Sequence, residues 1–405
     1  MKTPELLAPA GNWIMLRAAI NAKADSIYFG LKQLNMRMTA GNFELNELKN
    51  IAAECRKNKI KAYLCLNTII YDREIKELKN ILRKAREAKI DAIICWDFSV
   101  VNECEKLNLP VHLSTQASMS NFEAVKALKS KFKNITRINL ARELSLEQVK
   151  DIIKKIKQNK LNVEIECFIH GAMCVSISGR CFLSQHLFGK SANRGECLQP
   201  CRREYVVYDP EDKYKLKLGS SYVMSPKDLC ALPFIDKLIE AGINAFKIEG
   251  RNRSPEYVKT AVECYKEAIS NYKKLNEIKN KLLKKLKTAY NRGFSSGFYL
   301  GMPTAKDFAD AYGSKATSKK EYVGKVLNFY KKSNVALIKV ERLGFGINSE
   351  LMFQGNKTGV VNEKAETILN DRNEKTNKAK KGSIVTIKLK NAVRENDKVY
   401  LIKHF

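Results

Sequence analysis

The cysteines of this chain are the residues whose type and spacing say most about chemistry. Of the 11 cysteines in the sequence, five are scattered through patterns typical of helices or strands, where small buried thiols are expected. The other six crowd into one loop-rich region: Cys167, Cys174, Cys181, Cys197, Cys201 and Cys230. Thiolates gathered in this way can hold zinc or an iron–sulfur cluster.

The spacing of these cysteines bears on which metal they would hold. A structural zinc site typically has two tight pairs of cysteines, separated by two to four residues. Only Cys197 and Cys201 have such a spacing here, whereas Cys174 and Cys181 are further apart. The irregular spacing favours an iron–sulfur cluster over a zinc finger, but it excludes neither. A third interpretation is that these cysteines are simply buried and bind no metal.

Cysteines can also act as nucleophiles, which requires a partner histidine. A cysteine protease pairs its thiolate with a histidine and an orienting group. The chain has four histidines, and His170 and His186 flank the cysteine-rich region, so such a pair stays open. The H-E-x-x-H pattern of one large class of zinc proteases is absent.

The elements that must position these residues alternate between strands and helices. Apolar runs that predict strands lie at residues 5–9, 26–29, 61–67, 91–96, 111–116, 137–140, 163–169 and 245–249. Amphipathic patterns that predict helices lie between most of them, at 13–23, 45–58, 73–88, 122–131 and 146–157. Alternation of this kind predicts an α/β fold with a parallel sheet, and eight strands predict a (β/α)8 TIM-barrel-like domain over residues 1–303. A doubly wound open sheet is the alternative.

A cysteine-rich insertion, at about 171–244, separates the seventh and eighth predicted strands. Because the loops after the strands build the catalytic face of such a barrel, the insertion is expected to lie over that face. Gln116 and Glu249 stand at the ends of the fifth and eighth strands, where a barrel places catalytic groups. Glu166 lies within the seventh predicted strand. Its carboxylate could act as a catalytic base or could be buried and hydrogen-bonded, and the sequence leaves both roles open.

The pattern changes after the predicted barrel. Residues 304–320 are expected to be a polar linker, and residues 321–405 contain short strands separated by turn signals. This predicts a small all-β barrel domain at the C-terminus.

The charge of the chain favours a polyanionic partner. Lys and Arg number 73 against 43 Asp and Glu, a formal net charge of +30. The simplest such partner is nucleic acid. The alternative is that the excess lysines are only solvated surface residues and bind no particular partner. No apolar run reaches the length of a membrane span and no signal peptide is visible, so we expect a cytoplasmic protein without a membrane partner.

The segment 166–184 resembles the signature of the collagenase-like peptidase family, peptidase family U32. The fixed positions of its pattern, Glu-x-Phe-x-x-Gly with Cys-x4-Gly-x-Cys-x-x-Ser, are all occupied: Glu166, Phe168, Gly171, Cys174, Gly179, Cys181 and Ser184. Further segments similar to the same family are 5–11 (ELLAPAG), 35–43 (NMRMTAGNF), 114–117 (STQA), 246–251 (FKIEGR) and 291–297 (NRGFSSG). The resemblance covers essentially the whole chain, including a C-terminal barrel similar to the second domain of translation elongation factors.

The resemblance implies a function that the family name does not state. Within the family, the chain looks most like the prephenate-dependent tRNA hydroxylases, which form 5-hydroxyuridine at the wobble position. Such a resemblance implies a [4Fe–4S] cluster, prephenate as co-substrate, tRNA as substrate and the iron–sulfur assembly machinery as a partner. The alternatives are hydroxylation of a cytidine in 23S rRNA and a collagenase-like peptidase activity.

The family pattern also suggests ligands for the cluster. Cys174, Cys181 and Cys197 match it most directly. We prefer Cys230 as the fourth ligand, with Cys201 as the alternative, and expect Cys167 to point to the other side of its strand.

Prephenate carries two carboxylates, so its site should offer cations. Six cations fall at predicted strand ends or beside the cysteines, each with an ordinary surface role as the alternative: Arg37, Arg142, Arg180, Arg202, Lys247 and Arg251. His170 is a candidate proton donor near the cluster, or a hydrogen-bonded loop histidine.

Overall fold

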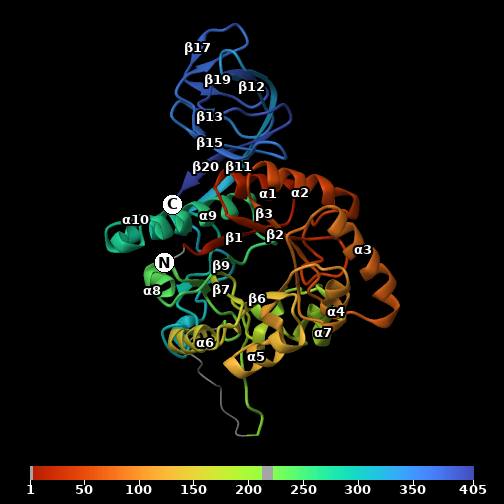
Figure 1. Cartoon of the computed structure of the whole chain (residues 1–405). Helices are drawn as coiled ribbons and strands as arrows, with labels where there is room; N and C mark the ends of the chain where they lie inside the picture. The colour runs from red at the N-terminus through yellow and green to blue at the C-terminus, as the bar shows by residue number, and fades with distance from the viewer. Residues whose placement is uncertain (1–2, 212–221) are drawn as a thin grey trace.

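The computed structural model describes residues 3–211 and 222–405, and the first part of the chain is a closed barrel of parallel strands surrounded by helices (Figure 1). Seven strands pair in sequence order, and the next parallel strand closes the ring by pairing with the first and the seventh. The strands are β1 (Glu5–Ala10), β2 (Ser26–Gly30), β3 (Lys61–Cys65), β4 (Ala92–Cys95), β5 (Val111–Leu113), β6 (Ile135–Asn139), β7 (Glu164–Gly171) and β9 (Ala245–Ile248). The predicted (β/α)8 TIM-barrel-like domain is confirmed.

The barrel strands are buried on both faces, which explains why they form nearly continuous apolar runs. In β1, Leu6, Ala8 and Ala10 belong to the large core between the strands and the helices. Leu7 points the other way and joins a small core with Tyr28 and other inward side chains. The alternation of side chains along a strand therefore gives the barrel an outer and an inner core.

The helices that cover the barrel are amphipathic. In order they are α1 (Trp13–Asn21), α2 (Leu48–Lys57), α3 (Ile75–Glu87), α4 (Phe98–Lys106), α5 (Phe122–Lys131), α6 (Leu146–Gln158), α8 (Ile235–Glu240) and α9 (Pro255–Ser270), with α10 (Leu275–Thr288) packed on α9. α6 shows how the sequence sets such a helix. Its N-cap Ser145 accepts a hydrogen bond from the Gln148 N–H, and its buried face carries Val149, Ile152 and Ile156.

The long segment between β7 and β9 folds over the carboxyl ends of the strands. It contains α7 (Leu183–Phe188), short 3-10 turns, and β8 (Asp228–Cys230), which pairs antiparallel with the end of β7 and parallel with β10 (Phe294–Ser295). The Thr68 hydroxyl donates to the Asn193 carbonyl over 3.0 Å, which ties the segment to the barrel. Gly195, at φ +90°, passes so close to the Asn35 carbonyl that a Cβ would lie 2.3 Å from it.

The C-terminal part of the chain is an antiparallel all-β domain, as the sequence predicts. Its sheet runs in the order β15-β14-β20-β11-β12-β19-β16-β17, and β13 and β18 form a separate pair. Their bounds are β11 (Ser318–Tyr330), β12 (Val335–Val340), β13 (Phe345–Gly346), β14 (Glu350–Gly355), β15 (Gly359–Lys364), β16 (Ile368–Leu369), β17 (Lys375–Thr376), β18 (Lys378–Ala379), β19 (Ile384–Lys388) and β20 (Lys398–His404).

The all-β domain packs on the outside of the barrel, against α1 and α9 (Figure 1). Ala18 of α1 contacts Met352 and Val360 in a small apolar cluster. The Asn21 amide donates to the Thr358 carbonyl over 3.0 Å. The domain thus lies beside the barrel and leaves the carboxyl ends of the strands to the cysteine-rich segment. None of the helices within residues 3–211 and 222–405 combines the length and apolarity that a membrane span requires.

Candidate active site

A polar cavity, which we call the barrel mouth, lies at the carboxyl ends of the parallel strands. Its charged lining consists of Arg37, Arg142, Lys247, Glu249 and Arg251, each on a strand or on the loop that follows one. One carboxylate therefore faces four cations, and the mouth is suited to a small anion that carries more than one negative charge. This is the end at which barrels of this type place their active sites.

Glu249 is the carboxylate of the mouth and is held by arginines. Its two oxygens lie 3.3 Å from Arg37 Nη2 and 3.8 Å from Arg142 Nη2. Burial raises the pKa of Glu249, but these arginines and the further cations Arg251 and Lys247 outweigh it, so the pKa lies below its ordinary value. Glu249 is therefore an anion that orients arginines at neutral pH.

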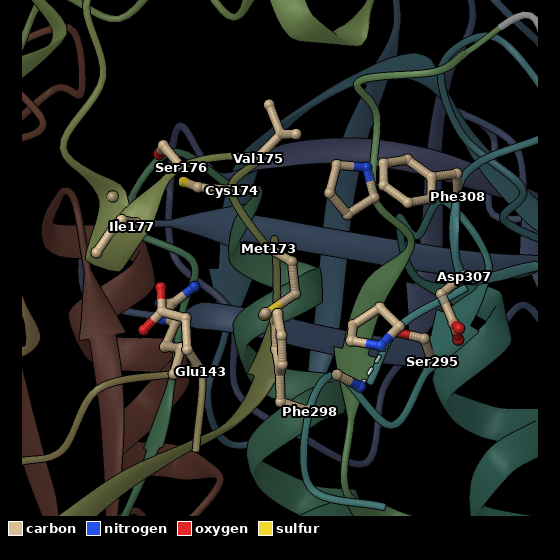
Figure 2. A pocket seen from close by; sticks show the side chains of 15 residues that line it. Glu143, Met173, Cys174, Val175, Ser176, Ile177, Ser295, Phe298, Asp307 and Phe308 are labelled. Carbon is tan, nitrogen blue, oxygen red and sulfur yellow. Dashed lines mark hydrogen bonds between the residues drawn. The ribbon is translucent and has the colours of Figure 1, made fainter. Parts of the chain in front are cut away.

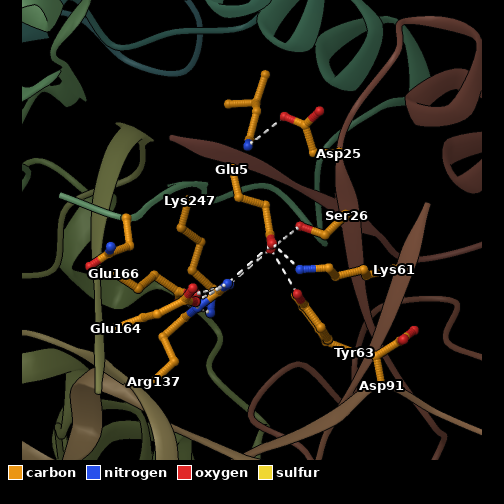
Figure 3. Close-up of polar contacts among 12 residues, drawn as sticks. Glu5, Asp25, Ser26, Lys61, Tyr63, Asp91, Arg137, Glu164, Glu166 and Lys247 are labelled. Carbon is orange, nitrogen blue, oxygen red and sulfur yellow. Dashed lines mark hydrogen bonds and ion pairs between the residues drawn. The ribbon is translucent and has the colours of Figure 1, made fainter. Parts of the chain in front are cut away.

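Lys247 links the mouth to a buried ionic network deeper in the barrel. Its ammonium donates to Glu166 Oε1 over 2.8 Å, and Glu166 Oε2 lies 3.5 Å from Arg137 Nη1 (Figure 3). Arg137, only 2% exposed, also bonds Glu5 and Glu164. Glu166 is thus an ion-pair partner beneath Lys247, and not a lining residue of the mouth.

The same network explains the charge of Glu5. Burial would raise its pKa, but hydrogen bonds from Arg137 and Lys61 hold the pKa well below its ordinary value. Tyr63 and Ser26 donate further hydrogen bonds to Glu5 Oε1, each over 2.8 Å (Figure 3). The inside of the barrel is therefore fixed by ionised groups, and these hold Lys247 from below.

Gln116 lies in the mouth, as a neutral polar group. It sits in a 3-10 turn directly after β5, is 6% exposed, and its carbonyl oxygen accepts hydrogen bonds from Ser114 and from Asn67, the latter over 3.2 Å. A side-chain amide held in this way can position a substrate and cannot serve as a base at neutral pH.

Four cysteines line a second cavity that adjoins the mouth, and we call it the cysteine chamber. They are Cys174, Cys181, Cys197 and Cys201. Cys174 is exposed and the other three are half-buried. Burial raises the pKa of the Cys201 thiol, Arg202 opposes this, and the neighbouring Cys174, Cys197 and Cys181 raise it further. The Leu183 N–H donates to Cys181 Sγ over 3.3 Å, a contact that stabilises a thiolate.

Cys230, which we preferred from the sequence as the fourth ligand, does not line this chamber. It is 3% exposed within the main core, pairs with His170 across β7 and β8, and accepts a hydrogen bond from the Tyr265 hydroxyl over 3.7 Å. Burial raises the pKa of its thiol to about 11. The structure thus places Cys201, the alternative, with the other three. Cys167 is also buried in the main core.

The donor set of the chamber consists of thiols, which are the ligands that an iron–sulfur cluster takes. Within the described residues, no three side chains of His, Cys, Asp or Glu are close enough together to hold one metal ion. An iron–sulfur cluster is wider than an ion and takes thiolates from four separated cysteines. Four thiols around one cavity, with three of them half-buried, meet that need.

His170 lies away from both cavities. Its ring packs among Tyr257, Tyr265 and Phe294, and its Nδ1 lies 3.4 Å from the Tyr265 hydroxyl. Burial, followed by the charge of Arg253, lowers its pKa to about 3. His170 is therefore neutral and buried, and it lines neither cavity, which argues against the role of proton donor near the cluster.

The predicted cations separate into three groups. Arg37, Arg142, Lys247 and Arg251 line the mouth, and Arg202 lines the cysteine chamber. Arg202 also donates to the Pro226 carbonyl over 2.9 Å. Arg180 is exposed, lies over the Trp96 ring at 5.8 Å and lines neither cavity.

Several lining residues were not singled out from the sequence. Asn35 lies behind the mouth and accepts a hydrogen bond from Arg251 over 3.1 Å, and Asn67 and Ser178 line the mouth itself. Arg253 lines the cysteine chamber and stacks on Tyr290 at 3.9 Å. Asn35 lies in the segment 35–43, which resembles the U32 family. This resemblance is a signal from which Asn35 could have been predicted as a site residue.

Comparison with known proteins identifies the family. A model of peptidase family U32 matches residues 11–308. The chain belongs to peptidase family U32. The cysteine chamber and the barrel mouth both lie within the matched residues.

Relatives in the U32 family carry names of different kinds. A Porphyromonas gingivalis protein named collagenase is 41% identical over 406 residues, which cover 98% of this chain and 97% of that protein. The Bacillus subtilis tRNA hydroxylation protein P1 is 33% identical over 376 residues, covering 91% of this chain and 87% of that protein. The Escherichia coli 23S rRNA 5-hydroxycytidine C2501 synthase is 33% identical over 265 residues, covering 65% of this chain and 39% of that protein.

Proposed function

We propose that this U32 protein is a cytoplasmic RNA-modifying hydroxylase. In this proposal it forms 5-hydroxyuridine at the wobble position of tRNA, with prephenate as co-substrate and a [4Fe–4S] cluster on Cys174, Cys181, Cys197 and Cys201. Relatives named for tRNA hydroxylation and for 5-hydroxycytidine synthesis in rRNA support the reaction class.

The observation that carries the proposal is that the two cavities share part of their lining. Cys174, Arg37 and Glu249 each line both the barrel mouth and the cysteine chamber. A group held by the cysteines would therefore adjoin any molecule bound in the mouth. Such contact between a redox centre and a bound substrate is what a hydroxylase needs and a purely structural cluster does not.

The charge of the mouth supports a dicarboxylate as the small substrate. Arg251 is 4% exposed and Lys247 is 3% exposed, so both cations are largely desolvated, which strengthens their attraction for an anion. Glu249 holds Arg37 and Arg142 in place before any ligand arrives. Preorganised cations of this kind suit the two carboxylates of prephenate.

A bound [4Fe–4S] cluster supplies a redox centre whose potential depends on nearby charge and hydrogen bonds. The protein groups have separate tasks. The Leu183 N–H and the cations Arg37 and Arg202 stabilise negative charge on the thiolates. Gln116 and Asn67 offer neutral hydrogen bonds to the molecule in the mouth.

A peptidase activity is the second candidate, because the relative with 41% identity is named collagenase. The geometry gives it little support. All four histidines are within the described residues, and none of them lines the cysteine chamber. His112 and His170 are buried, and burial lowers the pKa of both. A Cys–His pair for peptide hydrolysis is therefore missing from this part of the structure.

The test is nucleoside mass spectrometry of tRNA and of rRNA, isolated separately from cells with and without the gene. Loss of 5-hydroxyuridine or its derivatives from tRNA supports the proposal, whereas loss of 5-hydroxycytidine from rRNA supports the rRNA alternative. If neither pool changes under conditions in which the gene is expressed, the proposal is wrong.

A gelatin digestion assay decides the peptidase alternative. We expect neither the wild-type protein nor a Cys174→Ala/Cys181→Ala variant purified in parallel to digest gelatin above a protein-free blank. Digestion that co-purifies with the wild-type protein and survives in this variant would favour the peptidase.

A further inference from the structure

A third cavity, of ≈ 300 Å³, adjoins the barrel mouth, and its walls are largely apolar. We call it the apolar pocket. Met173, Phe298 and Phe308 line it, together with Pro226 and Pro303 (Figure 2). In the figure, Met173 and Phe298 lie between Ile177, on the left, and Phe308, on the right. Its size is at the lower end of the range for small-ligand sites.

One wall is the loop that follows β7, and hydrogen bonds hold it in place. The Ser178 N–H donates to Glu143 Oε1 over 2.7 Å. Arg142 Nη1 donates to the Ala172 carbonyl over 2.8 Å. The loop is therefore anchored at both ends.

The opposite wall is formed by residues 295–308 and is tied to the cysteine-rich segment. Pro226 and Phe308 form an isolated β-bridge, and the Lys227 N–H donates to the Asp307 carbonyl over 2.8 Å. Arg202 fastens Pro226 from the side of the cysteine chamber. Both walls are thus fixed by hydrogen bonds, and the pocket is preformed.

The pocket meets the other two cavities at Cys174 and Gly179, which line all three. Arg142 is shared with the mouth. A ring seated between the apolar walls would therefore lie next to Cys174 and next to the molecule in the mouth.

The chemistry of the lining selects a neutral, flat ligand. Aromatic, proline and methionine side chains suit a ring, and the carboxylates Glu143 and Asp307 disfavour a second anion. Outside, Arg180 and Lys306 are exposed next to lining residues, where they can contact phosphates. This pattern, an apolar pocket with aromatic side chains in its lining and exposed cations next to lining residues, matches a nucleotide whose base is turned out of its stack.

We propose that the apolar pocket receives the target pyrimidine base, unstacked from the RNA, beside Cys174. The proposal rests on the function proposed above and names the place where its RNA substrate would react. The anionic co-substrate would occupy the mouth at the same time, from the other side of Cys174.

The experiment uses a single-stranded RNA oligonucleotide with a fluorescent pyrimidine analogue at the target position, whose emission changes when it leaves its stack. Phe298→Ala removes a wall of the pocket. Ser176→Trp fills the pocket from a half-buried position that also borders the cysteine chamber, and it removes no large side chain. Phe405→Ala is the matched control, because Phe405 is a 76% exposed phenylalanine outside the pocket.

We expect saturable emission change with the wild-type protein and with Phe405→Ala, and at least about a fivefold smaller change with both pocket variants, since stacking on an aromatic ring contributes strongly to base binding. Fluorescence anisotropy should show that the pocket variants still bind the RNA backbone. An emission change that persists in both variants, or that is absent when the wild-type protein binds the RNA, would overturn the proposal.

Nucleoside mass spectrometry of cells that carry each variant separates this proposal from the proposed function. If Phe298→Ala and Ser176→Trp cells contain wild-type amounts of the modified nucleoside, the pocket assignment fails and the function stands. If wild-type cells contain none, the function fails, and the emission assay alone then decides whether a base enters the pocket.

Discussion

A cysteine can ligate a cluster only where its sulfur reaches the cavity that holds the cluster. Cys201 lines the same cavity as Cys174, Cys181 and Cys197, whereas Cys230 is buried in the core with Tyr265. We therefore predict that anaerobically purified Cys201→Ser loses most of its iron and acid-labile sulfide. Cys230→Ser, the matched control, should keep both at near wild-type amounts.

The measurement is iron and sulfide content per chain, determined for both variants and the wild-type protein in parallel. The opposite ranking, with iron lost from Cys230→Ser and kept in Cys201→Ser, would contradict the placement of the fourth ligand.

His170 makes the stability of the fold depend on pH. Its folded pKa of about 3 lies below the ordinary value of 6.5, because the ring is buried and faces Arg253. The unfolded chain therefore binds a proton at pH 5 that the folded chain does not, and stability falls as pH falls through the unfolded value. We predict that lowering the pH from 7 to 5 reduces the free energy of unfolding by about 2 kcal/mol through the titration of His170 alone.

A His170→Phe variant checks this prediction, because phenylalanine keeps the packing with Tyr257 and Tyr265. Chemical denaturation at both pH values should show a smaller pH dependence in the variant than in the wild-type protein. Equal pH dependence in the two proteins would show that His170 is not buried in its neutral form.

Residue types and spacing predicted some of this site and not the rest. Arg37, Glu249 and Arg251 line the mouth, as expected of residues in the loops that follow barrel strands. The sequence favours Cys230 over Cys201 as the fourth ligand, whereas Cys201 is the one that lines the chamber. The path of a long insertion is set by tertiary contacts, which spacing along the chain does not reveal. The side on which the His170 side chain lies could not be predicted either. A register shift between Phe168 and His170 interrupts the alternation of side chains along β7.

At the scale of elements, the barrel strands are held together from inside by ions. Arg137 on β6 reaches Glu5 on β1 and Glu164 on β7, over 2.9 and 2.6 Å. Removing it would leave the buried Glu166 and the largely buried Glu5 with fewer partners. We predict that Arg137→Met lowers the free energy of unfolding by about 3 kcal/mol.

The control for this prediction is Lys150→Met, which removes an exposed ion pair with Glu147 on α6. This replacement should change the free energy of unfolding by no more than about 0.5 kcal/mol. Chemical denaturation of both variants gives the comparison, and a loss below about 1 kcal/mol for Arg137→Met would show that the network contributes little to the barrel.

Most elements follow from local pattern, and the exceptions have physical reasons. β12 (Val335–Val340) is one of the short strands expected within residues 321–405, and its residues alternate between partly exposed and buried positions. No helix was predicted over α4, because adjacent Val100 and Val101 favour a strand. The Asp97 side chain, which accepts a hydrogen bond from the Ser99 N–H, caps that helix.

At the scale of the whole molecule, the all-β domain presents a basic edge to solvent. Four exposed lysines lie on or beside β17 and β18: Lys375, Lys378, Lys380 and Lys381. If this edge binds the RNA backbone, replacing all four by Gln should weaken binding of tRNA at low salt. It should also make the slope of log affinity against log salt shallower by about 0.7 to 0.9 for each phosphate that the protein no longer neutralises.

Fluorescence anisotropy with labelled tRNA at several salt concentrations gives both quantities. A quadruple Gln replacement of Lys273, Lys274, Lys279 and Lys284, exposed or half-buried cations on and before α10, is the matched control for net charge. Equal losses of affinity in the two variants would show that total charge, and not the all-β edge, governs RNA binding.

The central claim is that the cysteine chamber and the barrel mouth act together to hydroxylate tRNA. The most direct test is the content of 5-hydroxyuridine and its derivatives in tRNA from deletion cells that express wild-type protein, Cys174→Ser or Arg37→Gln. We predict that wild-type protein restores the modified nucleosides and that both variants, although folded and present in equal amount, fail to do so. Full restoration by Cys174→Ser, or no modification with wild-type protein, would contradict the account.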